Sequence, residues 1–213
     1  MSQDAHTHAV PVLVTDLMLA DQLRKEREAS DGAQHDEMWD GVYVMSPLPN
    51  NEHIEICAEL WLVFRTVLRE NRAGITYNGL NVSDREEGWT RNYREPDVAV
   101  FLVGNPAKNC GTHWCGGPDL LVEVLSPNDL AYQKMPFYAS IGVREVLIVD
   151  RDPWSLELYR REDGALNCVG RSNLERPDPL ASSVLPIAFR LVPSTPRPRI
   201  EVVRDSDGTT WLV

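Results

Sequence analysis

The chain has 213 residues, of which 43% are hydrophobic and 25% charged, a composition typical of a single globular domain with a buried core. Its net charge of −11, with three lysines among 21 basic residues, excludes a simple nucleic-acid coating protein, because phosphate binding of that kind requires a surface rich in Lys and Arg. No segment is apolar for long enough to span a membrane, and the N-terminus lacks the features of a signal peptide. We therefore expect no membrane partner and a cytoplasmic location.

The first third of the chain predicts a helix, a hairpin and a longer helix. We expect residues 1–14 to form a flexible arm and residues 16–29 to form a helix capped by Thr15. The Asp40-Gly41 pair between strand-forming residues predicts a hairpin at 37–45. From Asn50 or Asn51 to about residue 71, apolar side chains recur with helical spacing.

The remaining chain alternates strand and helix signals. Strands are expected at about 75–82 and 95–103, and the nearly continuous apolar run at 118–127 predicts a strand covered on both faces. A helix at about 129–141 and strands at 144–150, 154–160 and 166–171 complete a mixed sheet flanked by helices, an α/β (α+β) fold. We place this domain at 15–172. The Pro-rich segment 173–213 is expected to pack on it as an extension that ends in a hairpin around Asp207.

Glu123 is the most unusual residue of the sequence, because it lies in the apolar run Leu-Leu-Val-Glu-Val-Leu. A buried carboxylate must be protonated, ion-paired or bound to a cation, so a structural ion pair with an arginine is one interpretation. The other is a metal site shared with Asp97, which lies on a different predicted strand. If these strands pair, their ~4.8 Å spacing brings both carboxylates to one hard cation such as Mg²⁺ or Mn²⁺.

Several runs of the sequence form a recognisable set: R-E-P-D at 94–97, P-D-L-L-V-E-V-L-S-P at 118–127, the Lys134 to Gly142 segment, and W-D-G-V-Y-V-M-S-P at 39–47 with His53 after it. In this order, they resemble the Uma2 (DUF820) family of restriction-endonuclease-like proteins. The resemblance covers roughly residues 36–160. It implies the PD-(D/E)xK nuclease fold, a mixed sheet flanked by helices whose motif Asp and Glu hold a divalent cation.

Carried over onto this chain, the resemblance makes Asp97 and Glu123 the metal ligands. The lysine of the motif is expected two residues after Glu123, where this chain has Leu125. Lys134, on the following helix, matches a lysine that recurs in the family and is the candidate replacement. The implied activity is hydrolysis of phosphodiester bonds in DNA by an Mg²⁺ (or Mn²⁺) dependent endonuclease.

Three further residues are additional candidates for the site. Glu59, on the flank of the long helix, or His53, near the centre of its apolar face, could add a ligand, although a hydrogen-bonded core histidine is the simpler interpretation of His53. Tyr138, one turn after Lys134, could serve in packing or in catalysis. By functional analogy, double-strand cleavage would suit a homodimer.

Two other classes of protein stay open at this point. Leu125 and the acidic charge favour a catalytically inactive nuclease-fold module that binds nucleic acid or protein. A zinc-stabilised protein built on Cys110, His113 and Cys115 is the other, although a structural zinc site needs four ligands and no second pair is evident.

Overall fold

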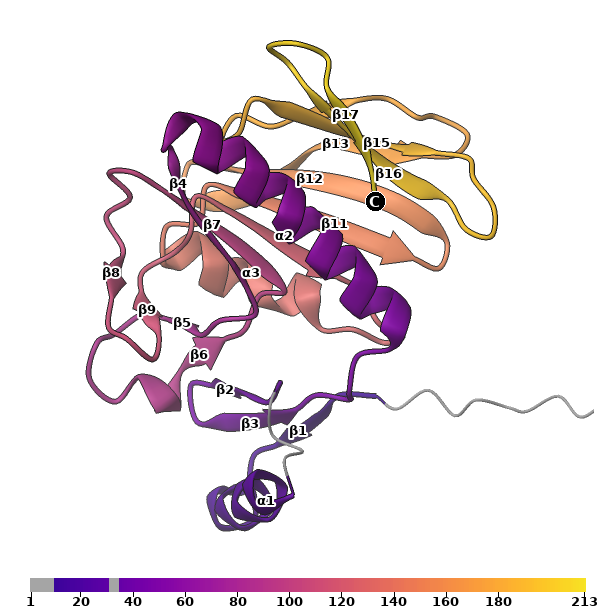
Figure 1. The fold of residues 1–213 in the computed structure, drawn as a ribbon. Helices are drawn as coiled ribbons and strands as arrows, with labels where there is room; N and C mark the ends of the chain where they lie inside the picture. The colour runs from indigo at the N-terminus through magenta and orange to yellow at the C-terminus, as the bar shows by residue number, and fades with distance from the viewer. Residues whose placement is uncertain (1–9, 31–34) are drawn as a thin grey trace, which may run out of the picture.

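A central mixed sheet organises the molecule (Figure 1). The structure is a computed structural model that describes residues 10–30 and 35–213. In spatial order the sheet comprises β13 (Ala165–Asn173), β12 (Trp154–Glu162), β11 (Glu145–Arg151), β10 (Leu120–Val124), β7 (Val98–Leu102) and β4 (Gly74–Asn78). Strands β10 and β11 are parallel and the other neighbours are antiparallel. The predicted mixed sheet and α+β class are therefore confirmed.

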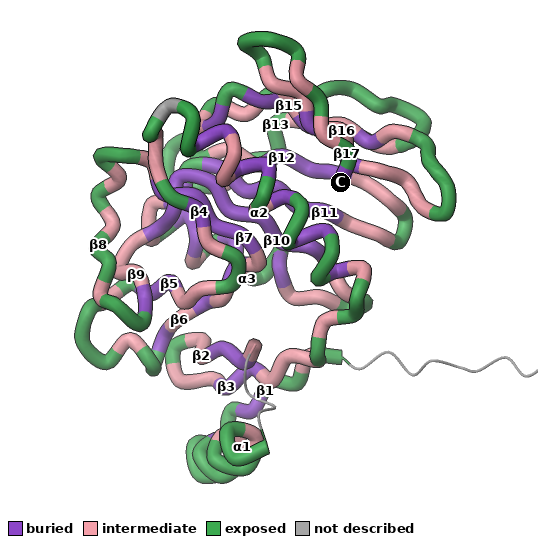
Figure 2. The backbone as a smooth tube through the Cα atoms, in the orientation of Figure 1, coloured by how far each residue is buried: buried purple, intermediate pink, exposed green. Residues whose placement is uncertain are grey.

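Both faces of the central strands are covered, as the apolar run at 118–127 predicted. Every residue of β10 is buried, and Figure 2 shows buried residues concentrated in the central strands. Because side chains alternate along a strand, Leu120, Val122 and Val124 lie in one core and Leu121 in the other. Glu123 has the same parity as Leu121 and thus faces the second core.

Helix α2 (Asn51–Asn71) covers one face of the sheet. It begins at Asn50, whose side chain accepts a hydrogen bond from the His53 N–H, the capping expected of Asn at this position. Its apolar side packs on the even-numbered side chains of β10. The predicted long helix is therefore confirmed at both ends.

Helix α3 (Ala131–Ser140) covers the opposite face and carries Pro136 within it. Met135 and Tyr138 belong to the second core, together with Leu121 of β10. Lys134 and Tyr138, four residues apart, project from the same side of this helix. The helix thereby brings both residues to the face of the sheet that carries Glu123.

A second sheet, below the first in Figure 1, joins the N-terminal hairpin to short strands from residues 82–115. Helix α1 (Leu17–Ala29), capped by Asp16 rather than Thr15, projects from it and is exposed almost throughout (Figure 2). The predicted hairpin is present, with φ positive at Asp40 and Gly41 as its tight turn requires. In spatial order the strands are β1 (Val12–Val14), β3 (Val42–Met45), β2 (Glu37–Trp39), β6 (Tyr93–Arg94), β5 (Val82–Ser83), β9 (Trp114–Cys115) and β8 (Lys108–Asn109). A single 3-10 turn, Trp89–Arg91, precedes β6.

Part of the expected flexible arm is regular structure. Residues 12–14 form β1, which pairs antiparallel with β3, because their apolar side chains can join the hairpin sheet. Residues 1–9 of that arm lie outside the described residues.

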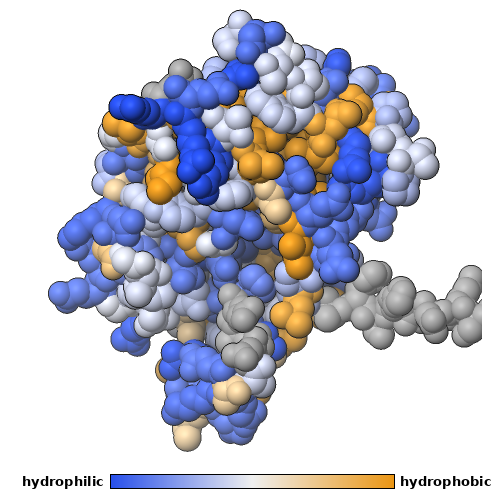
Figure 3. All heavy atoms as spheres, in the orientation of Figure 1, coloured by the Kyte–Doolittle hydropathy of each residue, from blue (hydrophilic) through white to orange (hydrophobic). Residues whose placement is uncertain are grey.

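The Pro-rich C-terminal segment, expected to pack on the domain as an extension, forms a third sheet. Its four antiparallel strands are β14 (Leu180–Ala181), β15 (Ile187–Val192), β16 (Arg199–Arg204) and β17 (Thr210–Leu212). The hairpin around Asp207 is present. Alternate residues of β15, among them Phe189, enter the same core as α2, and Phe189 packs edge-on against Phe64. In Figure 3 the hydrophobic side chains of this face gather over α2 and these strands.

No helix among the described residues is long and apolar enough to cross a membrane.

Candidate active site

A cavity of about 340 Å³ opens between the N-terminal hairpin, the central sheet and the helices that cover the sheet. The hairpin β2–β3, the start of α2, the ends of β7 and β10, and α3 all contribute to its walls. Five carboxylates face it, against a single lysine, Lys134. The carboxylates are those of Glu37, Glu95, Asp97, Glu123 and Asp129.

Asp97 and Glu123 meet at this cavity because β7 and β10 are neighbours. Val98 pairs with Val122 in the antiparallel register, so Asp97 and Glu123 occupy the next facing position, on strands about 4.8 Å apart. Asp97 Oδ2 also accepts a hydrogen bond of 2.7 Å from the Val124 N–H. The strand pairing on which the sequence prediction depended is therefore present.

Glu123 is 4% exposed, and two side chains of α3 contact its carboxylate. The Tyr138 hydroxyl donates to Oε1 at 2.5 Å, and Lys134 Nζ lies 3.2 Å from both carboxylate oxygens. Burial, reinforced by repulsion from Asp97 and Glu37 and opposed by Lys134, raises the pKa of Glu123 to about 8. The cation paired with Glu123 is thus a lysine, where the ion-pair interpretation expected an arginine.

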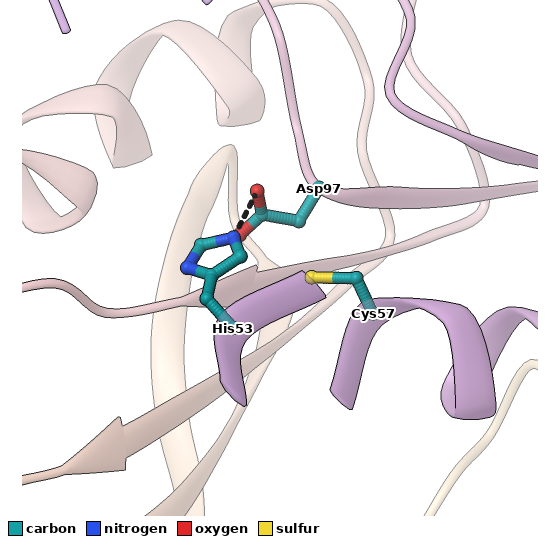
Figure 4. Close-up of side chains that lie close together, drawn as sticks. All are labelled: His53, Cys57 and Asp97. Atoms are coloured by element: carbon teal, nitrogen blue, oxygen red, sulfur yellow. Dashed lines mark hydrogen bonds and ion pairs between the residues drawn. The ribbon is translucent and has the colours of Figure 1, made fainter. Parts of the chain in front are cut away.

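The pKa of Asp97 shifts in the opposite direction. Figure 4 shows its carboxylate beside His53. Although burial disfavours its ionised form, hydrogen bonds from His53 and from the Val124 N–H hold the pKa of Asp97 below its usual value. His53 Nε2 lies 3.0 Å from Asp97 Oδ1. The imidazole reaches this position because Asn50 fixes the first turn of α2.

Glu37, on β2, is a site residue that the sequence analysis missed. It is 2% exposed, and its Oε1 lies 2.9 Å from Lys134 Nζ. The Glu95 N–H and the Trp39 indole N–H also donate to its carboxylate. The predicted hairpin was the only signal, since nothing in the sequence shows that this hairpin folds back over α3.

Lys134 therefore lies between two carboxylates. Burial alone would lower its pKa, but Glu123 and Glu37 outweigh this effect and raise the pKa of Lys134 above its usual value. The amine is charged and held in place at the cavity wall.

Some of the sequence candidates lie elsewhere. Glu59 is exposed and does not line the cavity. Within the described residues, Cys110, His113 and Cys115 do not form a group of metal ligands; His113 stacks on Trp89 and contacts the Arg85 carbonyl oxygen.

The site has the composition of a cation site. Five carboxylates against one lysine leave excess negative charge at the cavity, and the proton retained by Glu123 partly relieves it. Carboxylate oxygens are the ligands that Mg²⁺ and Mn²⁺ prefer. Asp97 and Glu123 therefore fit a hard divalent cation.

The comparisons with known proteins agree with this geometry. A family model described as "Uma2: Putative restriction endonuclease" matches residues 21–194. Among solved structures, the crystal structure of "a putative nuclease belonging to DUF820" from Anabaena variabilis is 20% identical, covers 75% of this chain and 80% of its own, and superposes with a TM-score of 0.53. That likeness shows a shared fold. The search of curated proteins found no match.

Proposed function

The chain belongs to the Uma2 family, and from this premise we propose that it is an endonuclease that hydrolyses phosphodiester bonds in DNA with Mg²⁺ or Mn²⁺. The pair of buried carboxylates on adjacent strands, Asp97 and Glu123, is the observation that supports this proposal most strongly. A phosphodiester is an anion, and a bound cation would allow it to approach a cavity lined by carboxylates.

Each side chain has a distinct role in the proposed reaction. Asp97 and Glu123 would hold the cation, which supplies Lewis-acid polarisation of the phosphate and a more acidic bound water. Lys134, whose amine lines the cavity, would donate a hydrogen bond to a phosphate oxygen as negative charge develops there. It replaces the lysine that the motif places at position 125.

Tyr138, His53 and Glu37 would act by positioning other groups. The Tyr138 hydroxyl orients Glu123, and His53 orients Asp97. Glu37 holds Lys134 from the side opposite Glu123.

We also propose that the protein acts as a homodimer through the outer edge of β1, with which no strand of the described residues pairs. This strand is terminal in its sheet, and Val12, Leu13, Leu17 and Met18 around it are exposed. Unpaired apolar edge strands favour pairing with another chain. Sedimentation velocity should show a dimer that Leu13→Lys converts to monomers and that Val103→Lys, at another exposed site, leaves intact. A monomeric wild-type protein would contradict it.

A cleavage assay tests the enzymatic proposal. Supercoiled plasmid and single-stranded DNA are incubated with Mg²⁺, Mn²⁺ or a chelator. The wild-type protein should cleave only with a cation, and Asp97→Asn, Glu123→Gln and Lys134→Ala should each reduce the rate by about a hundredfold or more. Glu59→Gln is the matched control, since Glu59 lies on α2 outside the cavity, and should retain full activity.

The outcome also separates the two classes of function left open by the sequence. Equal residual cleavage by every variant would indicate a contaminating nuclease. If the wild-type protein in addition bound no divalent cation, the non-catalytic module would be the better description.

A further inference from the structure

One buried thiol at the cavity has no part in the proposed hydrolysis. Cys57 is 4% exposed and lines the cavity together with His53 and Asp97. His53 and Cys57 are four residues apart on α2, so their side chains project from the same side of the helix. Figure 4 shows the imidazole, the thiol and the Asp97 carboxylate directed toward one another.

The three side chains are spaced for a metal ion. One ligand atom from each, with all pairs within 4.8 Å, surrounds a common point. If three atoms are all within 4.8 Å of one another, a point exists that is no more than about 2.8 Å from each of them. Zinc–ligand bonds are about 2.0–2.3 Å long. Side-chain shifts of about 0.5–0.8 Å would close the difference.

The donor set differs in chemistry from the carboxylate pair. An imidazole nitrogen, a thiolate sulfur and one carboxylate oxygen favour Zn²⁺ and similar borderline metals over Mg²⁺. Three protein ligands leave a fourth tetrahedral position open, and His53, Cys57 and Asp97 all line the cavity. Within the described residues this is the only group of three or more such side chains placed to share an ion.

The imidazole is also free to become a ligand. His53 is 9% exposed, and its Nδ1 has no hydrogen-bond partner among the described residues. Because no hydrogen bond from the described residues to Nδ1 fixes the proton on Nε2, the ring can change to the tautomer with its proton on Nδ1. A metal ion that replaced the hydrogen bond between Nε2 and Asp97 would take the Nε2 lone pair, with the ring proton on Nδ1.

From these observations we propose that His53, Cys57 and Asp97 form a Zn²⁺ site that shares Asp97 with the Mg²⁺ position. The Cys57 thiol loses its proton to solvent when the Zn–S bond forms. Because Asp97 cannot serve both ions at full strength, Zn²⁺ inhibits the Mg²⁺-dependent reaction. This inhibition rests on the proposed nuclease function, whereas the binding of Zn²⁺ does not.

Cobalt substitution tests the site in the full-length protein. Co²⁺ is added to chelator-treated protein without Mg²⁺, and a thiolate-to-Co²⁺ charge-transfer band in the near ultraviolet should appear, saturate at one equivalent and vanish when Zn²⁺ is added. The Cys57→Ala variant should lack the band but bind Mg²⁺ with unchanged affinity. The Cys110→Ser/Cys115→Ser double variant removes the rival thiols on β8–β9 and should keep the band.

A second variant covers the case in which Cys57→Ala does not fold. His53→Gln should retain a folded protein and lower Co²⁺ affinity by more than about tenfold, as removal of a ligand requires. The proposal is overturned if the band persists without Cys57 or disappears in the Cys110→Ser/Cys115→Ser variant. It is also overturned if His53→Gln binds Co²⁺ as tightly as the wild-type protein.

Activity separates the two proposals. If the protein shows the Cys57-dependent band but never cleaves DNA, the zinc proposal stands and the nuclease proposal is wrong. If it cleaves DNA, lacks the band and is not inhibited by Zn²⁺, the nuclease proposal stands and the zinc proposal is wrong.

Discussion

Glu123 and Asp97 show how two neighbouring carboxylates can differ in their readiness to ionise. Asp97 receives hydrogen bonds from His53 and from a backbone N–H that favour its charged form. Glu123 is more strongly affected by burial and by the negative charge of Asp97 and Glu37. A proton retained by Glu123 therefore offsets part of the negative charge around it.

Replacing Glu123 should change the pH dependence of stability. The pKa of Glu123 is about 8 in the folded protein against 4.5 for a solvent-exposed glutamate, so the folded state binds more protons than the unfolded state between these values. The free energy of unfolding therefore falls as pH rises through this window. Glu123→Gln removes the effect, so the Tm of this variant should exceed that of the wild type by a few degrees at pH 9. Below pH 4.5 the two Tm values should differ little, because Glu123 is then protonated and, like glutamine, neutral.

Circular dichroism melts of chelator-treated protein at several pH values measure this difference. Glu59→Gln is the exposed control. Parallel pH profiles for wild type and Glu123→Gln would show that Glu123 ionises without cost, which contradicts the account.

Tyr138 should influence the reaction through Glu123. Burial raises the pKa of Tyr138 well above its usual value, so its hydroxyl is protonated and donates to Glu123. Tyr138→Phe removes a hydrogen bond to the carboxylate and should shift the pH profile of metal-dependent cleavage upward by about one unit. A lower rate with an unshifted profile would instead indicate a purely structural role.

At the scale of elements, the site depends on three segments that are far apart in the sequence. Lys134 on α3 contacts Glu37 on β2 and Glu123 on β10. Arg94, on β6, strengthens the same junction, because its guanidinium lies 4.6 Å from the Trp39 ring and 4.2 Å from the Phe137 ring. The hairpin is thus part of the candidate site rather than an appendage.

The C-terminal sheet should be required for stability of the main core. Phe189 is fully buried and contacts Phe64 of α2, so Phe189→Ala leaves a cavity between the sheet and the helix. We expect a loss of about 3–5 kcal/mol in the free energy of unfolding, measured by urea denaturation. Val169→Ala, at a position 43% exposed, is the control, and equal effects of both substitutions would show that the C-terminal sheet packs only loosely.

At the scale of the whole molecule, local patterns predicted most elements, because helix and strand periodicities are encoded within each segment. The sequence also predicted the meeting of Asp97 and Glu123, since a carboxylate in a buried strand needs a partner. It did not reveal Glu37, Cys57 as a neighbour of Asp97, or the third sheet. Those depend on how the hairpin, α2 and the Pro-rich segment pack on the central sheet, which no local pattern specifies.

We propose that Asp97 and Glu123 form a cation site in which Mg²⁺ replaces a proton. Isothermal titration calorimetry with Mg²⁺ at pH 7, in buffers of different ionisation enthalpy, counts the protons released on binding. Since the pKa of Glu123 is about 8, the wild-type protein should release close to one proton for each Mg²⁺, and Glu123→Gln should release none and bind more weakly. Binding of equal strength in both proteins without proton release would contradict the account.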